Sequence, residues 1–320
     1  MPKYSIIVPV YNRPQELDDL LQSLTQQTFN DFEVLIIEDG SSITSEKVFE
    51  KYSAQLSIRY FFKANSGPGP SRNFGFEKAN GQFFIIFDSD CQIPPQYLEA
   101  VENFMRTTPF DAWGGPDRGN EKFTPLQQAM AYTMSSILTT GGIRGGKAKD
   151  FQPRSFNMGI SREAFQKTNG FLFDRFAEDI ELSIRMKKLG LRVGLIPEAF
   201  VYHQRRATLK DFFKQVSNFG KGRVLVGRAH RGETKLTHWF PSFFLFGLVT
   251  IIPLLLFVKC LGLLALACYI IYLLAIGIDA LQKTKSIRIA CLSVPSALVQ
   301  LTGYGFGFLK EIFALETTSK

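Results

Sequence analysis

The sequence contains little cysteine, histidine or tryptophan: four, three and two residues, respectively, among 320. Three of the cysteines, Cys260, Cys268 and Cys291, lie in strongly apolar segments, and no two cysteines have the spacing of zinc ligands. Disulfide-stapled domains and structural zinc sites need cysteine in larger numbers or in regular pairs. We therefore expect neither disulfides nor a zinc site.

Charge is almost absent from residues 239–278. One apolar run covers residues 239–258 and a second covers residues 261–278, with Lys259 as the only charged residue in or between them. A helix needs about 20 apolar residues to cross a bilayer. The two runs therefore predict two membrane-spanning helices.

A third apolar segment, residues 286–309, is interrupted by polar and flexible residues. It contains Arg288 near its start, Pro295 and Gln300 inside, and glycines at positions 303, 305 and 307. The segment could cross the membrane with a kink, or lie in the interface against the other two helices. We interpret its glycines as helix-packing or flexible positions and not as a phosphate-binding loop.

Positive residues flank the two predicted spans and indicate an orientation. They lie on the same side if the spans form a hairpin, and the positive-inside rule makes that side the cytoplasm. These residues are Arg223, Arg228, Arg231 and Lys235 before the first span, and Lys283, Lys285 and Arg288 after the second. Residues 1–10 are strand-like, so we expect no signal peptide. We predict a cytosol-facing domain over residues 1–232 and a membrane region over residues 233–320, in the inner or cytoplasmic membrane.

The net charge of +8 does not indicate a nucleic-acid partner. The part of the chain before the spans has no basic stripe interleaved with aromatic residues, which such a partner would require. A basic balance also suits a protein that lies against anionic lipid headgroups. We expect no binding to nucleic acid.

Short apolar runs alternate with amphipathic helical patterns in the first hundred residues. Leucines at positions 17, 20, 21 and 24 form one helical stripe. The predicted strands cover residues 5–9, 32–37, 58–62 and 83–87. Strands buried on both faces and separated by helices are typical of a mostly parallel sheet in an α/β layer fold.

The pattern continues beyond the first hundred residues. The glycine-rich residues 141–151 predict a loop. Further strands are expected over residues 156–160 and 191–196, and helices over residues 178–189 and 208–226. The α/β region therefore extends to the start of the membrane region.

Polar residues follow each of the first four predicted strands. Tyr11 follows the first, Asp39 the second, Arg72 the third, and the triplet Asp88–Ser89–Asp90 the fourth. Ligands of such sheets bind beyond the carboxyl ends of the strands. We therefore expect these side chains to meet at one edge of the sheet.

The two aspartates of the triplet are candidate metal ligands. Carboxylate oxygens suit Mg²⁺ or Mn²⁺, and an ion there would stabilise the charge of a departing diphosphate. The alternative is a solvated turn or a helix cap.

Asp39 could accept hydrogen bonds from a base or a ribose, or cap the next helix. Residues 65–73 form a tight loop before a helix, and Arg72 together with that helix start favours an anionic or base-carbonyl partner.

Glu178 and Asp179 begin a predicted helix, where the helix dipole stabilises acidic residues without a catalytic role. Alternatively, one of them is a general base that removes a proton from an incoming hydroxyl. Asp179 is the better candidate, because Glu178 can hold the helix end.

His203 follows a strand-like run. It could approach a metal or diphosphate, or be an ordinary core or surface residue.

Together these motifs resemble glycosyltransferase family 2. Residues 5–42 and 65–91 are similar to the amino-terminal half of its GT-A fold, and residues 156–203 are similar to the acceptor half. The resemblance covers roughly residues 3–225. It implies an α/β GT-A-type sheet flanked by helices, here followed by an all-α membrane region. It also implies inverting transfer with bound Mn²⁺ or Mg²⁺.

The resemblance also implies roles for individual residues. Asp39 and Arg72 would contact the nucleotide base, with Pro9 and Tyr11 beside it. Asp88 would serve the ribose, and Ser89 would lie with it in the donor site. Asp90 would bind the metal, with His203 near it. Asp179 would act as the base. The expected donor-site residues are therefore Pro9, Tyr11, Asp39, Arg72, Asp88 and Ser89.

One departure from the family bears on processivity. Processive synthases of this family carry a glutamine, two further residues and then arginine–tryptophan, whereas residues 204–207 here are Gln-Arg-Arg-Ala. We therefore expect single sugar additions, from a nucleotide-sugar donor to a membrane lipid or lipid-linked glycan. A UDP-sugar is favoured by analogy. Two alternatives are a polyprenyl-phosphate glycosyl synthase, whose phosphate acceptor needs no base, and a non-catalytic sugar-nucleotide-binding membrane protein.

Overall fold

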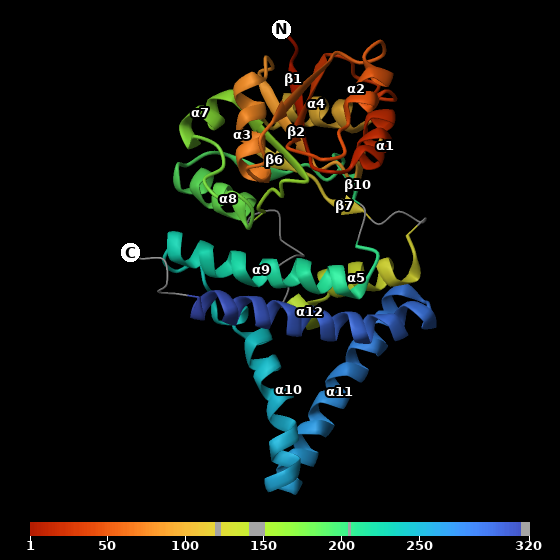
Figure 1. Ribbon diagram of the computed structural model, residues 1–320, viewed down its shortest axis with the longest axis vertical. Coiled ribbons are helices and arrows are strands. Elements are labelled where there is room, and N and C mark those ends of the chain that lie inside the picture. The colour runs from red at the N-terminus through yellow and green to blue at the C-terminus, as the bar shows by residue number, and fades with distance from the viewer. Residues whose placement is uncertain (119–122, 141–150, 204–205, 315–320) are drawn as a thin grey trace. The chain divides into compact units, whose positions relative to one another are not determined.

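The computed structural model describes residues 1–118, 123–140, 151–203 and 206–314 (Figure 1). The chain divides into two compact units. Met1–Asn120 and Lys147–Gln204 form the first unit, and Glu121–Gly146 and Arg205–Lys320 form the second. The predicted domain boundary at residues 232 and 233 stays a prediction. Most of the glycine-rich segment 141–151, and Gln204–Arg205, lie outside the described residues.

A mixed seven-stranded sheet forms the centre of the first unit. Its strand order is β3-β2-β1-β4-β8-β6-β9. Strands β3, β2, β1 and β4 are parallel, β8 is antiparallel to β4 and β6, and β9 is parallel to β6. The strands are β1 (Tyr4–Val10), β2 (Phe32–Asp39), β3 (Ile58–Lys63), β4 (Phe83–Phe87), β6 (Ala112–Gly114), β8 (Asn157–Ser161) and β9 (Val193–Leu195). The α/β class and the mostly parallel sheet are confirmed.

Helices cover both faces of this sheet. Ile6 and Val8 of β1 pack into one core with the leucine stripe of α1, and Ile7 packs into a second core with Phe76 and Leu182. Successive side chains of a strand point to opposite faces, so burial of all three requires a helical layer on each side. The helices are α1 (Pro14–Leu24), α2 (Glu46–Tyr52), α3 (Pro68–Lys78), α4 (Tyr97–Thr107), α7 (Arg162–Thr168) and α8 (Glu178–Lys188).

A small second sheet lies in the same unit and joins distant parts of the sequence. It contains β5 (Cys91–Gln92), β7 (Asp117–Arg118) and β10 (Val201–His203), in the order β5-β10-β7. Strand β10 is antiparallel to β5, with His203 opposite Cys91. This pairing brings His203 next to the residues that follow β4.

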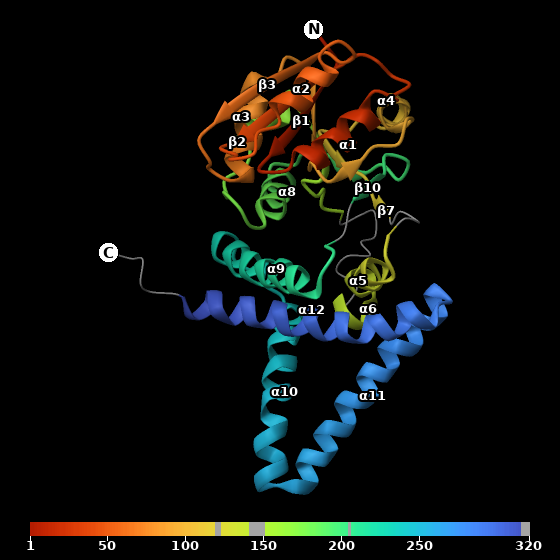
Figure 2. The ribbon, with the colours of Figure 1, turned by 45° about the vertical axis from the view of Figure 1, so that its right-hand side comes forward.

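The second unit is helical (Figure 2). Helices α10 and α11 pack against each other as a hairpin, and α12 packs along α9 and α5. Its elements are α5 (Pro125–Ser135), α6 (Ile137–Thr140), α9 (Leu209–Ala229), a 3₁₀ turn (Leu236–His238), α10 (Phe240–Phe257), α11 (Lys259–Thr284) and α12 (Ile287–Phe313). Three segments, Leu236–Phe257, Lys259–Thr284 and Ile287–Phe313, are long and apolar enough to cross a membrane.

The glycines of α12 lie at close helix contacts. A Cβ atom on Gly307 would come within 1.9 Å of the Ser217 carbonyl oxygen of α9, and one on Gly305 within 2.4 Å of the Pro241 carbonyl oxygen of α10. Small residues allow helix backbones to approach this closely. The interpretation of these glycines as helix-packing positions is confirmed.

Candidate active site

The predicted site residues of the first unit lie where strands end or helices begin, in both the seven-stranded and the three-stranded sheet. Asp39 is the last residue of β2, the Asp88 triplet directly follows β4, and His203 ends β10. Asp179 lies in the first turn of α8. Parallel strands end at the same edge, which is why residues distant in sequence meet there.

Arg72 joins the triplet to the start of α8. Its side chain is 3% exposed and lies 2.8 Å from Asp88 (Nη2 to Oδ1) and 2.6 Å from Glu178 (Nη1 to Oε1). Its buried Nε has no hydrogen-bond partner among the described residues. One guanidinium thus positions two carboxylates that lie 90 residues apart in sequence, and charge-assisted bonds of this kind are strong and directional.

The Glu178 side chain is buried, and the carboxylate of the adjacent Asp179 is more exposed. Burial raises the pKa of Glu178 to about 6, and the nearby Arg72 opposes this shift. The prediction that Glu178 merely holds the helix end is therefore incomplete, because its carboxylate forms the ion pair with Arg72. Sequence reasoning missed this contact.

Asp179 keeps an accessible carboxylate at the beginning of α8. Its side chain is 17% exposed. Oδ1 accepts a hydrogen bond from the Ile180 amide at 2.8 Å, Oδ2 accepts one from the Ser155 amide at 3.4 Å, and Arg154 lies 3.9 Å away. These contacts hold the Asp179 carboxylate in one orientation at the first turn of α8.

Asp90 and His203 form a candidate metal pair. His203 Nε2 lies 3.1 Å from Asp90 Oδ1, and the Phe156 ring stacks on the imidazole with centroids 4.7 Å apart. The Cys91 thiol lies within 4.8 Å of the other two ligand atoms, and burial raises its pKa well above the ordinary range. A carboxylate with an imidazole suits Mn²⁺, and fits Mg²⁺ less well because Mg²⁺ prefers oxygen ligands.

Asp39 is tied into the loop that precedes α3. Its carboxylate accepts hydrogen bonds from the Ser66 and Gly67 amides, each at 2.9 Å, and pairs with Lys63. Burial opposes its ionisation, but these donors outweigh burial and lower the pKa of Asp39. Gly67 has φ +97°, which favours glycine, and a Cβ there would meet the Asp174 carbonyl oxygen at 2.9 Å.

The remaining predicted donor residues lie around the end of β1. Pro9 is half-buried in β1, and Tyr11 directly follows the strand with its ring exposed. Ser89 is buried and donates a hydrogen bond to Glu16 at 3.4 Å. Arg13, which sequence reasoning did not single out, lies 3.6 Å from Asp90. It therefore adds positive charge beside the candidate metal pair.

Comparison with known proteins identifies the family. The model for Glycosyl transferase family 2 matches residues 5–168, just over half of the chain, and the model for Glycosyl transferase family group 2 matches residues 155–278. The chain belongs to glycosyltransferase family 2. The family 2 match contains the ends of β2 and β4 and the start of α3, and the second match contains Asp179 and His203.

Curated relatives of this family 2 chain match it in part. The uncharacterized glycosyltransferase EpsJ of Bacillus subtilis (strain 168) is 25% identical over 66% of this chain and 64% of its own length. The poly(ribitol-phosphate) beta-N-acetylglucosaminyltransferase TarS of Staphylococcus aureus (strain Mu50 / ATCC 700699) is 36% identical over 33% of this chain and 19% of its own length. An uncharacterized glycosyltransferase of Rickettsia bellii is 35% identical, but the match spans only 16% of that protein.

Solved structures support the GT-A-type fold. The mannosyltransferase PcManGT from Pyrobaculum calidifontis, in complex with GDP-Man and Mn²⁺, aligns with a TM-score of 0.62 at 16% identity, over 98% of this chain and 88% of that chain. S. aureus TarS 1-349 in complex with UDP-GlcNAc aligns with a TM-score of 0.50 at 19% identity, over 98% and 93% of the two chains. The predicted fold class is confirmed.

Two contacts of the family 2 site had no signal in the sequence. The Arg72–Glu178 pair joins residues 106 positions apart, and the Arg13–Asp90 pair depends on how α1 packs beside the end of β4. An arginine could pair with many of the acidic residues in the chain, and nothing in the sequence singles out a glutamate so far away. Only the fold selects which pair forms.

Proposed function

We propose that the protein is a metal-dependent inverting glycosyltransferase that moves a sugar from a nucleotide diphosphate to an acceptor hydroxyl. The observation that carries this proposal is the connected set of charges at one edge of the sheet. Arg72 contacts both Asp88 and Glu178, Asp179 is the next residue of the same helix, and Asp90 contacts His203. Electrostatic preorganisation of this kind is what transfer away from a diphosphate requires.

The donor is a nucleotide sugar, with a UDP-sugar favoured. The solved neighbours were crystallised with UDP-GlcNAc or with GDP-Man, and that chemistry supports a nucleotide-sugar donor here. Pro9, Tyr11 and Asp39 would lie beside the base, and Asp88 with Ser89 beside the ribose. Arg72 has both ends of its guanidinium occupied by carboxylates, so we assign it the positioning of Asp88 in place of a contact with the base.

Asp90 and His203 would hold a Mn²⁺ or Mg²⁺ ion. When bound, such an ion neutralises the charge that develops on the departing diphosphate. Arg13, 3.6 Å from Asp90, adds a second positive charge on the same side. The imidazole makes Mn²⁺ the better match to this pair.

Asp179 would accept the proton of the acceptor hydroxyl. The acceptor oxygen forms a bond to the anomeric carbon while the bond from that carbon to the diphosphate oxygen breaks, and the electron pair leaves with the diphosphate. The proton passes to the Asp179 carboxylate, so atoms and charge balance. Attack opposite the leaving group inverts the anomeric configuration.

Membrane anchoring supports an acceptor that is a lipid or a lipid-linked glycan on the cytoplasmic face. The absence of the processive motif supports single additions.

The test is the isosteric substitution Asp179→Asn in the full chain. General bases contribute about 100- to 10,000-fold, so we expect sugar transfer to fall at least about 100-fold. Binding of the nucleotide sugar with Mn²⁺ should be retained, measured by calorimetry on detergent-solubilised protein. Asp19→Asn is the matched control, because Asp19 is exposed on α1 and should leave both quantities unchanged.

Other outcomes select the alternatives. Full activity of Asp179→Asn with a polyprenyl-phosphate acceptor would favour a polyprenyl-phosphate glycosyl synthase, because a phosphate acceptor needs no base. Donor binding without transfer or hydrolysis across a broad panel of labelled nucleotide sugars would indicate a non-catalytic binding protein. Absence of any metal-dependent donor binding would refute the proposal.

A further inference from the structure

Helix α12 has one apolar exposed face and one buried face that contains polar and small residues. A mostly apolar stripe recurs every three or four positions; it is exposed at Ile287, Cys291, Pro295, Phe306 and Phe313 and half-buried at Leu298, Thr302 and Leu309. Ile287 is 73% exposed and Phe313 is 78% exposed, at opposite ends of the helix. On the other face, Ser293, Ser296 and Gln300 are buried. A helix surrounded by lipid would expose apolar residues on all sides that are free of protein.

Protein covers the buried face of α12 along most of its length. Near its start, Ala290 and Ala297 pack with Tyr132 of α5. Near its end, Gly303 and Gly307 approach α9, and Glu311 pairs with Arg228 at 3.0 Å. In the most apolar 18-residue stretch of α12, 50% of the stretch is buried inside the protein. The corresponding buried share is 17% in the segment containing α10 and 11% in α11. Helix α12 is therefore held at the depth of α5 and α9 in the membrane.

Helix α9 is too charged to enter the hydrocarbon. Its exposed cations include Lys210, Lys214 and Arg228, distributed from its first turn to its last. A charged side chain at the bilayer centre costs about 2.5–3.5 kcal/mol or more. Since α12 runs alongside α9, as Figures 1 and 2 both show, α12 cannot cross the bilayer while α9 stays in the headgroup region.

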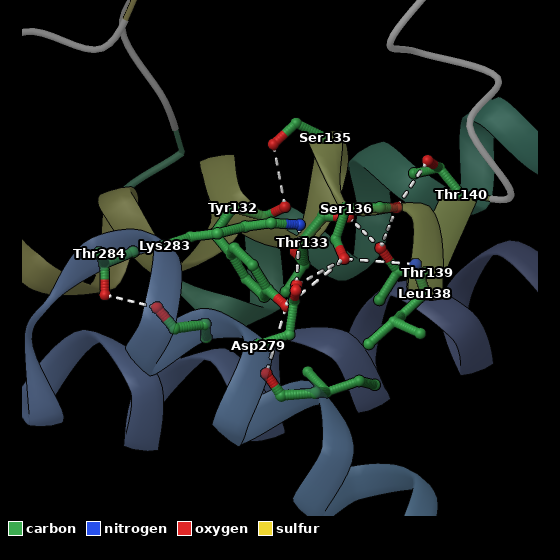
Figure 3. A network of polar contacts seen from close by, with 12 residues as sticks. Tyr132, Thr133, Ser135, Ser136, Leu138, Thr139, Thr140, Asp279, Lys283 and Thr284 are labelled. Carbon is green, nitrogen blue, oxygen red and sulfur yellow. Dashed lines mark hydrogen bonds and ion pairs between the residues drawn. The ribbon is translucent and has the colours of Figure 1, made fainter.

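The C-terminal end of α11 lies at the same depth as α5. Figure 3 shows Tyr132 of α5, and Ser136 directly after that helix, directed at Asp279 of α11, which also pairs with Lys283 at 3.0 Å. Residues 259–278 precede this polar network and are apolar apart from Lys259. At 1.5 Å per residue they extend about 30 Å, the thickness of the hydrocarbon core. Helix α11 thus crosses the hydrocarbon before it reaches α5.

We propose that α12 lies in the plane of the membrane–water interface, with its apolar stripe in the lipid. Within the residues that the structure describes, only α10 and α11 then cross the bilayer, and both ends of α12 face the same side. Lys285, Arg288 and Lys310 lie near the ends of α12 and can reach lipid phosphates. The occupant of the stripe is the lipid bilayer, whose apolar region continues from the exposed faces of α10 and α11. This proposal is independent of the transferase activity.

Cysteine accessibility in the full chain tests the topology. Cys260, Cys268 and Cys291 are replaced by serine, buried Cys91 is retained, and a single cysteine is introduced as Arg288→Cys or Lys310→Cys, one near each end of α12. Sealed vesicles of each orientation are treated with a membrane-impermeant maleimide. We expect both positions to react in the same vesicle orientation. Reaction in opposite orientations would show that α12 spans and would overturn the proposal.

Helix α11 provides the matched control, because it has nearly the same length: 26 residues against 27. Lys259→Cys and Lys285→Cys, at its two ends, should react in opposite vesicle orientations. Reaction of both in one orientation would mean that the hairpin does not cross the bilayer, and this too would overturn the proposal.

A depth measurement covers the case in which these variants insert poorly. A fluorophore on Leu298→Cys, at the middle of α12, should be quenched more strongly by lipids spin-labelled near the headgroup than by lipids labelled deep in the acyl chain. A fluorophore on Cys268, inside α11, should show the reverse order. Stronger deep quenching at position 298 would contradict the proposal. Quenching by neither lipid would mean that protein, such as a second copy of the chain, covers the stripe, and would also contradict it.

Discussion

The two units of this protein differ in how many large apolar side chains they expose. In the first unit, apolar residues fill both faces of the sheet, and the buried Arg72 lies against two carboxylates. In the second unit, large apolar residues of the hairpin are exposed, with Phe246 at 68% and Leu256 at 74%, while serines such as Ser293 are fully buried. Water drives apolar groups inward in the first unit. Three segments of the second unit are long and apolar enough to cross a membrane, and lipid around such helices would remove that drive and leave close packing to hold them together.

Equivalent substitutions should therefore have different effects in the two units. A buried ion pair, a buried isoleucine and a helix-contact glycine each have a counterpart elsewhere in the chain. The ion-pair and isoleucine substitutions compare the two units, and the glycine substitutions compare a close with an ordinary helix contact inside the second unit.

The largest effect is expected from breaking the buried ion pairs of Arg72. Arg72→Met leaves Asp88 and Glu178 without their common partner, and removing one member of a buried pair costs about 3–5 kcal/mol in free energy of unfolding. The counterpart Arg228→Met removes the exposed pair with Glu311 in the second unit, which should cost less than about 1 kcal/mol. Denaturant unfolding in detergent measures both. Equal losses would remove the distinction between the units.

The next effect comes from shortening one isoleucine in each unit. Ile36 of β2 is fully buried, so Ile36→Ala should lower the free energy of unfolding by about 2–5 kcal/mol through lost burial and a cavity. Ile252 of α10 is 67% exposed, and Ile252→Ala should change stability by less than about 0.5 kcal/mol. Thermal unfolding in detergent gives the comparison. A large loss at position 252 would mean that protein covers that face of α10.

A glycine substitution tests the close contact between α12 and α9. Gly307→Ala would bring a Cβ within 1.9 Å of a backbone carbonyl oxygen, and overpacking of this kind costs about 1–3 kcal/mol. Gly277→Ala of α11 is the control, because its Cβ would meet Val294 at an ordinary 3.4 Å. We expect a lower melting temperature for Gly307→Ala alone. Unchanged stability of both variants would indicate that the helices separate without cost.

The smallest effect concerns pH. The pKa of Glu178 is raised by burial from 4.5 to about 6, so its contribution to stability is fully present below pH 4.5 and is lost as pH rises through 6. A pKa raised from 4.5 to about 6 corresponds to roughly 2 kcal/mol. Relative to Glu178→Gln, the unmodified chain should lose up to that amount between pH 4.5 and pH 7. Parallel stability profiles of the two proteins would show that Arg72 outweighs burial at this site.

Most of the secondary structure of the first unit could be predicted because it depends on local patterns. The strand predicted over residues 83–87 matches β4, and the leucines predicted to form one helical stripe are all buried in α1. Asp39 and Asp88 were expected at the carboxyl ends of their strands, and they lie there. The ends of elements differ by a few residues, since terminal hydrogen bonds depend on neighbours in space.

The contacts among the site residues could be predicted only in part. The sequence indicated which residues gather at the sheet edge, but it indicated Glu178 only as the end of a helix. Its bond to Arg72 forms because α8 begins beside α3, and that placement follows from the packing of the whole sheet. Likewise, β10 pairs with β5 and brings His203 to Asp90, although β10 follows β5 by about a hundred residues.

The sequence by itself determined the α/β pattern, the polar residues at the strand ends and the two apolar runs of the hairpin, because spacing and composition act over a few neighbouring residues. Only the tertiary structure decided which charges pair, and which face of α12 is covered by α5 and α9. Those contacts join residues that are far apart in the chain, and their energy depends on distances that no local pattern contains.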